Sequence, residues 1–419
     1  MKKSALLIFS LVLMQLTTCS LSNTATLNTA TPPAKASPTA DFTATPTTIM
    51  PTATLTAIPS PTPDSDACWS RLPAVPDEVT LPGKLVFKSN GLSIIDFKQH
   101  NTRRATDKVV TNVAISPNGE WLSYFSDGRT ELTIESADGQ VKRQVPAPAG
   151  VGWLSLFDGL PWLDNERLWI SEWPDIGESP PVDIINPFTG EQQKILSNYP
   201  GLELYPKTPG LHFEYSSVVY NPSLQLVAYP EVTKDGYAYI TLWDRQAKKA
   251  LARVPDGGAY GHPPIWLPDG NRFVVVAATD WDSPREWQML SRDGTVHQLT
   301  HFQDIYGKDF EISPYASISP DGKYLAFGLS LNKDSRSTAS PKKLFILNLT
   351  TLELINTCVW FRDYPAPIWS PDSQYVSVLN VNWDLHEGKP ASFVVLNMED
   401  QWVANVPGDL KSELVGWLK

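Results

Sequence analysis

The sequence predicts an all-β protein made of repeated four-stranded antiparallel sheets, and three observations support this prediction. A Ser-Pro-Asp-Gly-like turn followed by an apolar strand recurs along the chain, most clearly at 317–328 and 368–379. Successive turn prolines are 46, 52 and 51 residues apart, at Pro222, Pro268, Pro320 and Pro371. The segments between the turns alternate short apolar strands with polar connections. This period indicates a repeat array, because one small sheet cannot bury both faces without neighbours.

Each repeat begins with a short strand and a tight turn. Proline presets φ at the first turn position, and glycine accepts the backbone angles that a tight hairpin needs. The turn is also present at 114–125 and 265–276, and in weaker form at 220–229 and at 162–171, which lacks the proline. A second apolar strand follows each turn directly.

The second half of each repeat supplies two more strands. Third strands are predicted at 237–243, 342–349 and 392–398, and a fourth strand is predicted at 295–301. Four antiparallel strands per repeat are typical of one blade of a β-propeller. The tryptophans at one shared first-strand position, predicted to fill the core between blades, are Trp266, Trp369 and Trp417.

The two ends of the repeat region complement each other. Residues 413–419 match a first strand without its turn, whereas 84–89, 92–97 and 102–106 match second, third and fourth strands. We therefore predict a seven-bladed β-propeller of four-stranded antiparallel blades. Pairing of the C-terminal strand with the N-terminal blade closes it and removes the open sheet edge. Six or eight blades remain alternatives, because the unit at 151–196 is degenerate.

The repeated turns resemble those of the TolB-like propeller family, a relative of the WD repeat, whose units carry a Ser-Pro-Asp-Gly signature. The resemblance covers residues 84–419 and implies the propeller fold. The family includes partner-binding periplasmic proteins, propeller domains of peptidases and a few lyases. A fold of this kind does not by itself select a function.

The N-terminus predicts export. Two lysines precede the apolar run 5–16, which is the arrangement of a signal peptide over residues 1–18 and is short for a membrane span. The motif 16–19, Leu-Thr-Thr-Cys, resembles a bacterial lipoprotein box, in which the cysteine receives diacylglycerol; Thr18 departs from the usual Gly or Ala. We expect lipidation at Cys19 and a membrane-anchored protein at the cell surface or in the periplasm. An ordinary secretory signal is the alternative.

Residues 19–65 form a Thr/Pro/Ala-rich tract with almost no charge, which cannot bury a core and is predicted to be a disordered spacer. A short N-terminal extension, 66–83, separates this tract from the repeats. The formal net charge of −11 argues against nucleic acid or anionic lipid as a partner, because both need clustered Lys or Arg. We expect a monomer that contacts the membrane through the N-terminal lipid alone.

The two remaining cysteines, Cys68 and Cys358, are candidates for a disulfide in an exported chain. Two separately buried thiols are the alternative. A bridge between the two would strap the N-terminal extension across the seam at which the ring of blades closes.

The sequence contains none of the catalytic or cofactor motifs that we sought. It has no G-x-S-x-G elbow, no H-E-x-x-H, no C-x-x-C, no P-loop and no dinucleotide-binding glycine set. We therefore expect no cofactor and no enzyme activity. His212, His262 and His301 fall in three successive connections between blades and are the weak candidates for a metal site.

Aromatic side chains in the long connections are the candidate ligand-binding residues. They are Trp173, Trp281 and Trp383 after second strands, and Tyr260, His262, Tyr306 and Tyr364 between blades. In a propeller these connections share one face, and loops on a rigid scaffold often carry function. Aromatic planes with the neighbouring acidic residues suit a sugar or a peptide. The alternative is that these aromatics pack the loops against themselves.

The sequence thus predicts an extracytoplasmic, lipid-anchored propeller that binds a protein or glycan of the cell envelope without catalysis. The alternative function is that of a propeller enzyme of lyase or hydrolase type. Such an enzyme would act on polysaccharide or peptide through the same face, with or without a metal ion.

Overall fold

The computed structural model describes residues 68–126, 131–146, 162–171, 182–196, 198–201, 218–256, 263–279, 283–331, 342–362, 365–380, 392–406 and 413–419. All of them belong to the unit 53–419. The predicted signal peptide, Cys19 and the Thr/Pro/Ala-rich tract lie outside these residues. Within the described ranges the chain is built from strands and one short helix, α1 (Phe302–Tyr306), so the all-β prediction is confirmed.

One four-stranded sheet joins the two ends of the repeat region. Its order is β28–β2–β3–β4, with β28 (Glu413–Leu418), β2 (Lys84–Ser89), β3 (Gly91–Asp96) and β4 (Asn101–Thr106). The pairing of β28 with β2 is antiparallel and places Trp417 opposite Leu85. We call this the first sheet.

Three further four-stranded antiparallel sheets follow along the chain. Their strands are β5 (Val110–Ile115), β6 (Trp121–Ser126), β7 (Glu131–Ser136) and β8 (Lys142–Pro146); β12 (Val219–Tyr220), β13 (Leu226–Val232), β14 (Ala238–Asp244) and β15 (Lys249–Pro255); and β16 (Ile265–Trp266), β17 (Arg272–Ala278), β18 (Arg285–Ser291) and β19 (Val296–Gln298). The degenerate unit gives a three-stranded sheet of β9 (Leu168–Ser171), β10 (Val182–Ile185) and β11 (Gln192–Ile195). There, a single bridge between Trp162 and Leu168 stands where the other units have a first strand.

The remaining strands form one larger sheet that has two four-stranded halves. The first half is β20 (Glu311–Ile318), β21 (Tyr324–Ser330), β22 (Lys342–Asn348) and β23 (Leu354–Phe361), and the second is β24 (Ile368–Trp369), β25 (Tyr375–Asn380), β26 (Ser392–Asn397) and β27 (Trp402–Val406). A single residue pair, Phe361 with Asn380, connects the halves.

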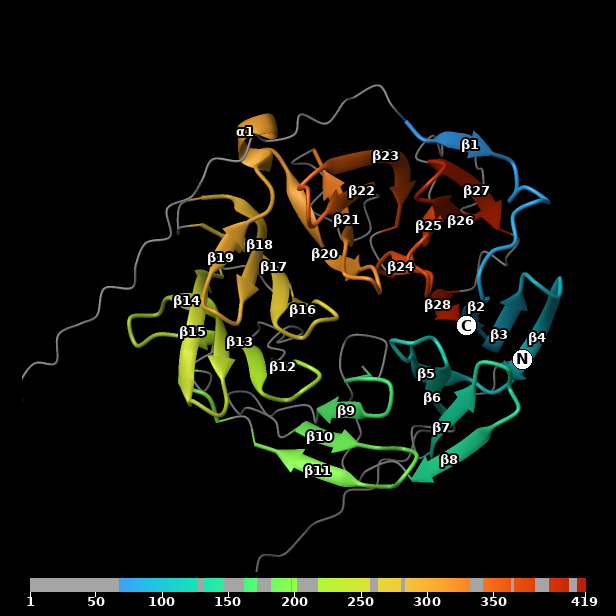
Figure 1. The fold of residues 1–419 in the computed structure, drawn as a ribbon, viewed down its shortest axis with the longest axis horizontal. Coiled ribbons are helices and arrows are strands. Elements are labelled where there is room, and N and C mark those ends of the chain that lie inside the picture. The colour runs from blue at the N-terminus through green and yellow to red at the C-terminus, as the bar shows by residue number, and fades with distance from the viewer. Residues whose placement is uncertain are drawn as a thin grey trace, which may run out of the picture. The chain divides into compact units, whose positions relative to one another are not determined.

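Successive sheets are neighbours in space (Figure 1). They pack against each other through hydrophobic clusters. Among the described residues there are seven clusters. Six of them each contain residues of two sheets, and the seventh lies between the two halves of the larger sheet. The last-to-first cluster contains Phe393 and Val395 of β26 together with Leu85 of β2. Face-to-face packing of successive four-stranded sheets is typical of a β-propeller.

The hydroxyl of the turn serine explains the repeated Ser-Pro-Asp-Gly signature. Ser319 is fully buried, donates a hydrogen bond of 2.7 Å to Asp321 Oδ1 and accepts one of 2.9 Å from the backbone N–H of Tyr324. Ser370 and Asp372 repeat this arrangement. Gly322 has φ of 74°, which glycine adopts without strain. The signature therefore closes a tight turn and starts the next strand.

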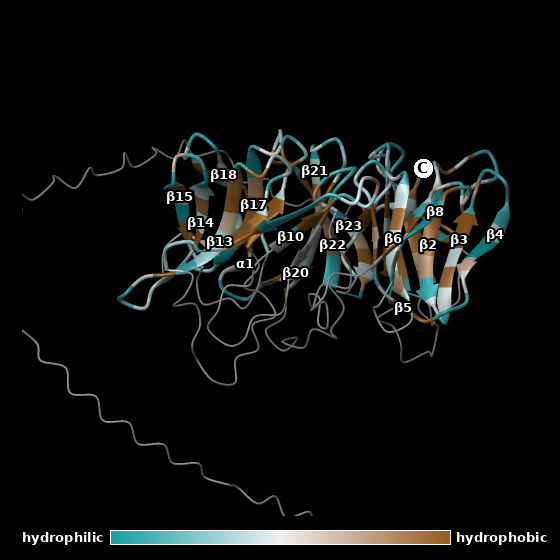
Figure 2. Ribbon diagram, turned by 90° about the horizontal axis from the view of Figure 1, so that it is seen from below, coloured by the Kyte–Doolittle hydropathy of each residue, from teal (hydrophilic) through white to brown (hydrophobic). Residues whose placement is uncertain are grey.

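These turns also connect neighbouring sheets. The backbone N–H of Asp321 donates a 3.0 Å hydrogen bond to Ser373 Oγ in the next sheet, and Asn221 Nδ2 donates one of 2.8 Å to the carbonyl oxygen of Gly270. Figure 2 shows polar turns along one edge of the apolar strands. We call this edge the turn face.

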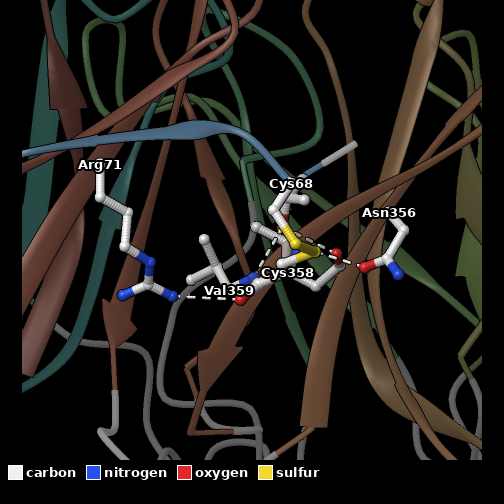
Figure 3. The surroundings of a disulfide bond; sticks show 7 residues. Cys68, Arg71, Asn356, Cys358 and Val359 are labelled. Carbon is white, nitrogen blue, oxygen red and sulfur yellow. Dashed lines mark hydrogen bonds between the residues drawn. A yellow bond between two sulfur atoms is a disulfide. The ribbon is translucent and has the colours of Figure 1, made fainter. Parts of the chain in front are cut away.

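The N-terminal extension forms a strap across the two halves of the larger sheet. Strand β1 (Ser70–Leu72) pairs in parallel with β27, a pairing that the sequence did not predict. A disulfide joins Cys68 to Cys358 of β23, and Arg71 Nη2 donates a 3.1 Å hydrogen bond to the Cys358 carbonyl oxygen (Figure 3). Trp69 is 4% exposed in the cluster between the halves of the larger sheet. The strap thus covers an inter-sheet core at its outer side.

Candidate functional site

The candidate tryptophans occupy equivalent connections in three different sheets. Trp173 lies between β9 and β10, Trp281 between β17 and β18, and Trp383 between β25 and β26. Each connection joins a second strand to a third strand. The strand ends that flank these connections are opposite to the turn face, so we call this side the loop face.

Most of the candidates lie outside the described residues. They are Trp173, Trp281, Trp383, Tyr260, His262, Tyr364 and His212. Tyr306 and His301 are described, and both lie at the connection between β19 and β20. The geometry of the loop face is therefore built from these two residues and from the strand ends.

Tyr306 belongs to α1, a helix that the sequence analysis did not predict. Its ring stacks on that of Phe302 with the ring centroids 6.1 Å apart, and Phe302 is almost fully buried in the cluster between β16–β19 and β20–β23. Burial raises the pKa of the Tyr306 phenol above its ordinary value. This ring is half-buried, so it packs against the core while one side remains open to solvent.

A buried carboxylate holds this connection in place. Glu286 of β18 accepts a 2.6 Å hydrogen bond from the Thr300 hydroxyl and a 2.8 Å hydrogen bond from the backbone N–H of Gln303. Burial raises the pKa of the Glu286 carboxyl, although these two hydrogen bonds oppose the shift. Because it binds a free amide of the first helical turn, Glu286 acts as an anchor for α1.

His301 precedes α1 and has polar neighbours of its own. Its Nδ1 lies 3.1 Å from Gln298 Nε2 and 3.9 Å from Asp304 Oδ2. No group of three His, Cys, Asp or Glu side chains suited to a metal ion occurs in the described part of the chain. The other two histidines of the predicted set, His212 and His262, lie outside it.

Two ion pairs tie first strands to another strand of the same sheet at the loop face. Lys342, at the start of β22, is 1% exposed, and its Nζ lies 2.9 Å from Oε2 of Glu311, at the start of β20. Lys88 of β2 pairs in the same way with Glu413 of β28, at 3.1 Å. A buried ammonium needs its partner, because an unpaired charge in the interior is costly. The Lys342–Glu311 pair therefore stabilises the start of β22, to which the long connection 331–341 leads.

A second candidate site lies between the extension and the first sheet. A cavity of about 680 Å³ separates the strap from β2, β3 and β4. The sequence analysis missed its residues, which include Asp77, Ser93, Thr102 and Asn405. The available signal in the sequence was Ser93, a serine of β3 at a position where a large apolar side chain is expected.

Comparison with known proteins gives structural neighbours only. No protein-family model and no curated protein matches the sequence. The chain is similar to TolB from Acinetobacter baumannii, with 15% identity over 80% of this chain and 81% of that chain and a TM-score of 0.42. It is similar to an oligogalacturonate lyase from Vibrio parahaemolyticus, with 13% identity over 78% and 86% of the two chains and a TM-score of 0.48. It is also similar to the Cps50 (Swd1) β-propeller domain of Myceliophteria thermophila, with 13% identity over 72% of this chain and 90% of that chain and a TM-score of 0.41.

A search for membrane-spanning helices among the described residues found none of sufficient length and apolar character.

Proposed function

We propose that this chain is an exported, lipid-anchored, seven-bladed β-propeller that binds a protein or glycan of the cell envelope without catalysing a reaction. Its binding surface is the loop face, and the lipid is attached at Cys19. Trp173, Trp281 and Trp383 supply aromatic planes for the ligand.

The difference between the two faces of the sheets carries this proposal. On the turn face, short turns hydrogen-bond to one another from sheet to sheet, as Asn221 does to Gly270. On the loop face, the strand ends are joined by the longest connections between second and third strands, such as 331–341 and 381–391. A rigid scaffold that presents long connections on one side is typical of a binding protein.

The blade count rests on the cyclic packing of the sheets. The seven blades are the first sheet, the sheets that begin with β5, β9, β12 and β16, and the two halves of the larger sheet. The seven hydrophobic clusters support this count. The antiparallel pairing of β28 with β2 supports closure through the C-terminal strand.

The loop face is tested by alanine scanning once a ligand has been found by glycan array and by pull-down from envelope extract. Alanine at Trp173, Trp281 or Trp383 should weaken binding by about 1–3 kcal/mol through lost aromatic burial, with little change in melting temperature. Trp369→Ala is the matched control, because Trp369 is buried between sheets, and it should cost about 3–5 kcal/mol of stability. Loop tryptophans that prove as destabilising as Trp369 are packing residues, and the proposed surface is then wrong.

The anchor and the absence of catalysis have their own tests. Wild-type protein should incorporate labelled palmitate and partition into detergent, whereas Cys19→Ser should do neither. Equal aqueous partitioning of both proteins indicates an ordinary signal peptide.

Metal analysis of the mature chain addresses the enzyme alternative. A stoichiometric divalent ion that is lost in a His212→Ala or His262→Ala variant favours a metal-dependent enzyme.

A further inference from the structure

The cavity beside the strap lies at the seam between the last sheet and the first sheet. Its walls are residues 74–81 of the extension, one face of β2, β3 and β4, and Asn405 of β27. Its lining residues come from the extension, the first sheet and β27, whereas the proposed binding surface is carried by the connections that follow β9, β17 and β25. A ligand at this place would therefore be an addition to the proposed function.

A small side chain opens this space. Ser93 of β3 pairs with Phe87 of β2, and Phe87 faces the preceding sheet. In the sheet β20–β23 the corresponding pair is Phe327 with Phe345, which also faces the preceding sheet. Phe345 is 1% exposed and fills the core there. The hydroxymethyl group of Ser93 leaves the volume of an aromatic ring unfilled at the equivalent position.

The lining combines apolar surface with neutral hydrogen-bonding groups. Phe87, Phe97 and Val75 contribute apolar surface. The hydroxyl groups come from three adjacent strands, and they are Ser89 of β2, Ser93 of β3 and Thr102 of β4; the side-chain amides are those of Asn101 and Asn405. A lining of this kind provides shape through its apolar part and orientation through a few polar groups.

The charged groups of the lining have both signs, with Asp77 and Asp96 against Arg104, and two of them bond to other parts of the protein. Arg104 forms an ion pair with Asp107 and donates a 2.7 Å hydrogen bond to the Asn90 carbonyl oxygen. Asp96 accepts a 3.0 Å hydrogen bond from the backbone N–H of Gln99. No cluster of one charge is thus presented by the lining, which favours an uncharged ligand.

The wall formed by the extension is held on both sides. On the N-terminal side of the cavity, the disulfide of Cys68 and the pairing of β1 with β27 fix the extension. On the C-terminal side of the cavity, Leu81 fixes the extension, because it is 1% exposed in the last-to-first cluster. A wall that is ordered before binding reduces the entropy that a ligand must overcome.

We propose that this cavity binds a short neutral oligosaccharide. Sugars present apolar C–H surfaces together with many hydroxyl groups, and the lining offers apolar rings beside serine, threonine and asparagine side chains. A volume of about 680 Å³ lies within the range of about 300–1,000 Å³ that is usual for small-molecule sites. The strap serves as one wall of the site, so binding depends on the disulfide.

Isothermal titration calorimetry of the mature chain with cellobiose, maltose and chitobiose at millimolar concentration tests this proposal. At least one disaccharide should bind to the wild-type protein. Ser93→Phe and Thr102→Phe should each raise its dissociation constant at least tenfold, because a ring then occupies the cavity. Reduction of the disulfide should raise the dissociation constant of the disaccharide as well.

Gln144→Phe on the exposed side of β8 is the matched control and should bind as the wild type does. Trp281→Ala should also bind normally, which separates this site from the loop face. The proposal is overturned if none of the three sugars binds, or if Ser93→Phe and Thr102→Phe leave the affinity unchanged while their melting temperatures stay at the wild-type value. Equal loss of affinity in the Gln144→Phe control would also overturn it.

Discussion

The indole Nε1 of Trp417 donates a 3.0 Å hydrogen bond to the hydroxyl oxygen of Ser377, from the last strand of the chain to the second strand of the preceding sheet. Trp369 makes a similar contact of 3.2 Å to the Ser317 carbonyl oxygen one sheet earlier. Trp417 is 3% exposed and stacks on Tyr375 with centroids 6.4 Å apart. The first-strand tryptophans thus fill the core and satisfy their polar atom across the seam between sheets.

Trp417→Ala should lower the free energy of unfolding by about 3–5 kcal/mol, because it leaves a large cavity at the last-to-first seam. Ser377→Ala should cost less, about 1–3 kcal/mol, since the seam keeps its apolar contacts but the buried indole N–H loses its acceptor. Denaturant unfolding of the two variants measures the difference. Similar values for both would mean that the indole ring contributes little to packing at this seam.

Loss of the disulfide should destabilise the protein by about 2–5 kcal/mol, since the bond closes a loop with a sequence separation of 290 residues. Cys68→Ser, Cys358→Ser and the double variant should have the same stability, because each removes one bond. Reduction should also expose Trp69 and shift the tryptophan emission to longer wavelength. An unchanged melting temperature after reduction, verified by thiol titration, would contradict a stabilising strap.

Gly83→Ala should be more destabilising than Gly190→Ala, although both glycines have positive φ, of 71° and 78°. A Cβ at Gly190 meets nothing within 4 Å, so that variant should lose about 1–2 kcal/mol from backbone strain alone. A Cβ at Gly83 would lie against the carbonyl oxygen of Leu418, so the end of β28 must then move away from the start of β2. The excess loss for Gly83→Ala in thermal unfolding measures how closely β28 approaches the start of β2; equal losses would contradict this close approach.

The stability of the wild-type protein should fall, relative to Glu286→Gln, as the pH rises above 4.5, the ordinary glutamate pKa. Burial raises the pKa of Glu286 in the folded state, so the folded state binds its proton more tightly than the unfolded chain does. The stabilisation by that proton is complete below the unfolded pKa and is lost as the pH passes the folded pKa. Denaturation curves from acidic to neutral pH measure this slope.

Glu78→Gln is the control for the pH series, because Glu78 is exposed and its variant should follow the wild-type curve. A Glu286→Gln variant whose stability changes with pH as the wild type's does would show that Glu286 does not titrate differently on folding.

Several elements could be predicted because their causes are local. The strands 84–89 and 342–349 were predicted within one residue, since apolar runs bounded by turn residues indicate strands. Asp321–Gly322 was predicted as a turn, and the side chain of Asp321 and the positive φ of Gly322 close it. The pairing of the strand at 413–419 with the strand at 84–89 was also expected, because the repeat region begins and ends at complementary strands.

Other elements depend on contacts that no local pattern announces. Strand β1 has three residues, and it exists because the edge of β27 and the bond of Cys68 to Cys358 hold it. The sequence left free thiols open as an alternative. Helix α1 was missed because its five residues are anchored from β18 by Glu286. The cavity was missed because it depends on how three strands face the strap.

By itself, the sequence determined the repeat, the turn chemistry and the position of the candidate tryptophans within the repeat, because these depend on residues that are near neighbours along the chain. The tertiary structure alone decided that β1 pairs with the edge of β27 and that a cavity stays open beside the extension. The reason is physical: pairing at an edge and filling of a seam depend on surfaces brought together from residues such as Cys68 and Cys358, far apart in the chain. Their contact free energy exists only after the sheets have packed.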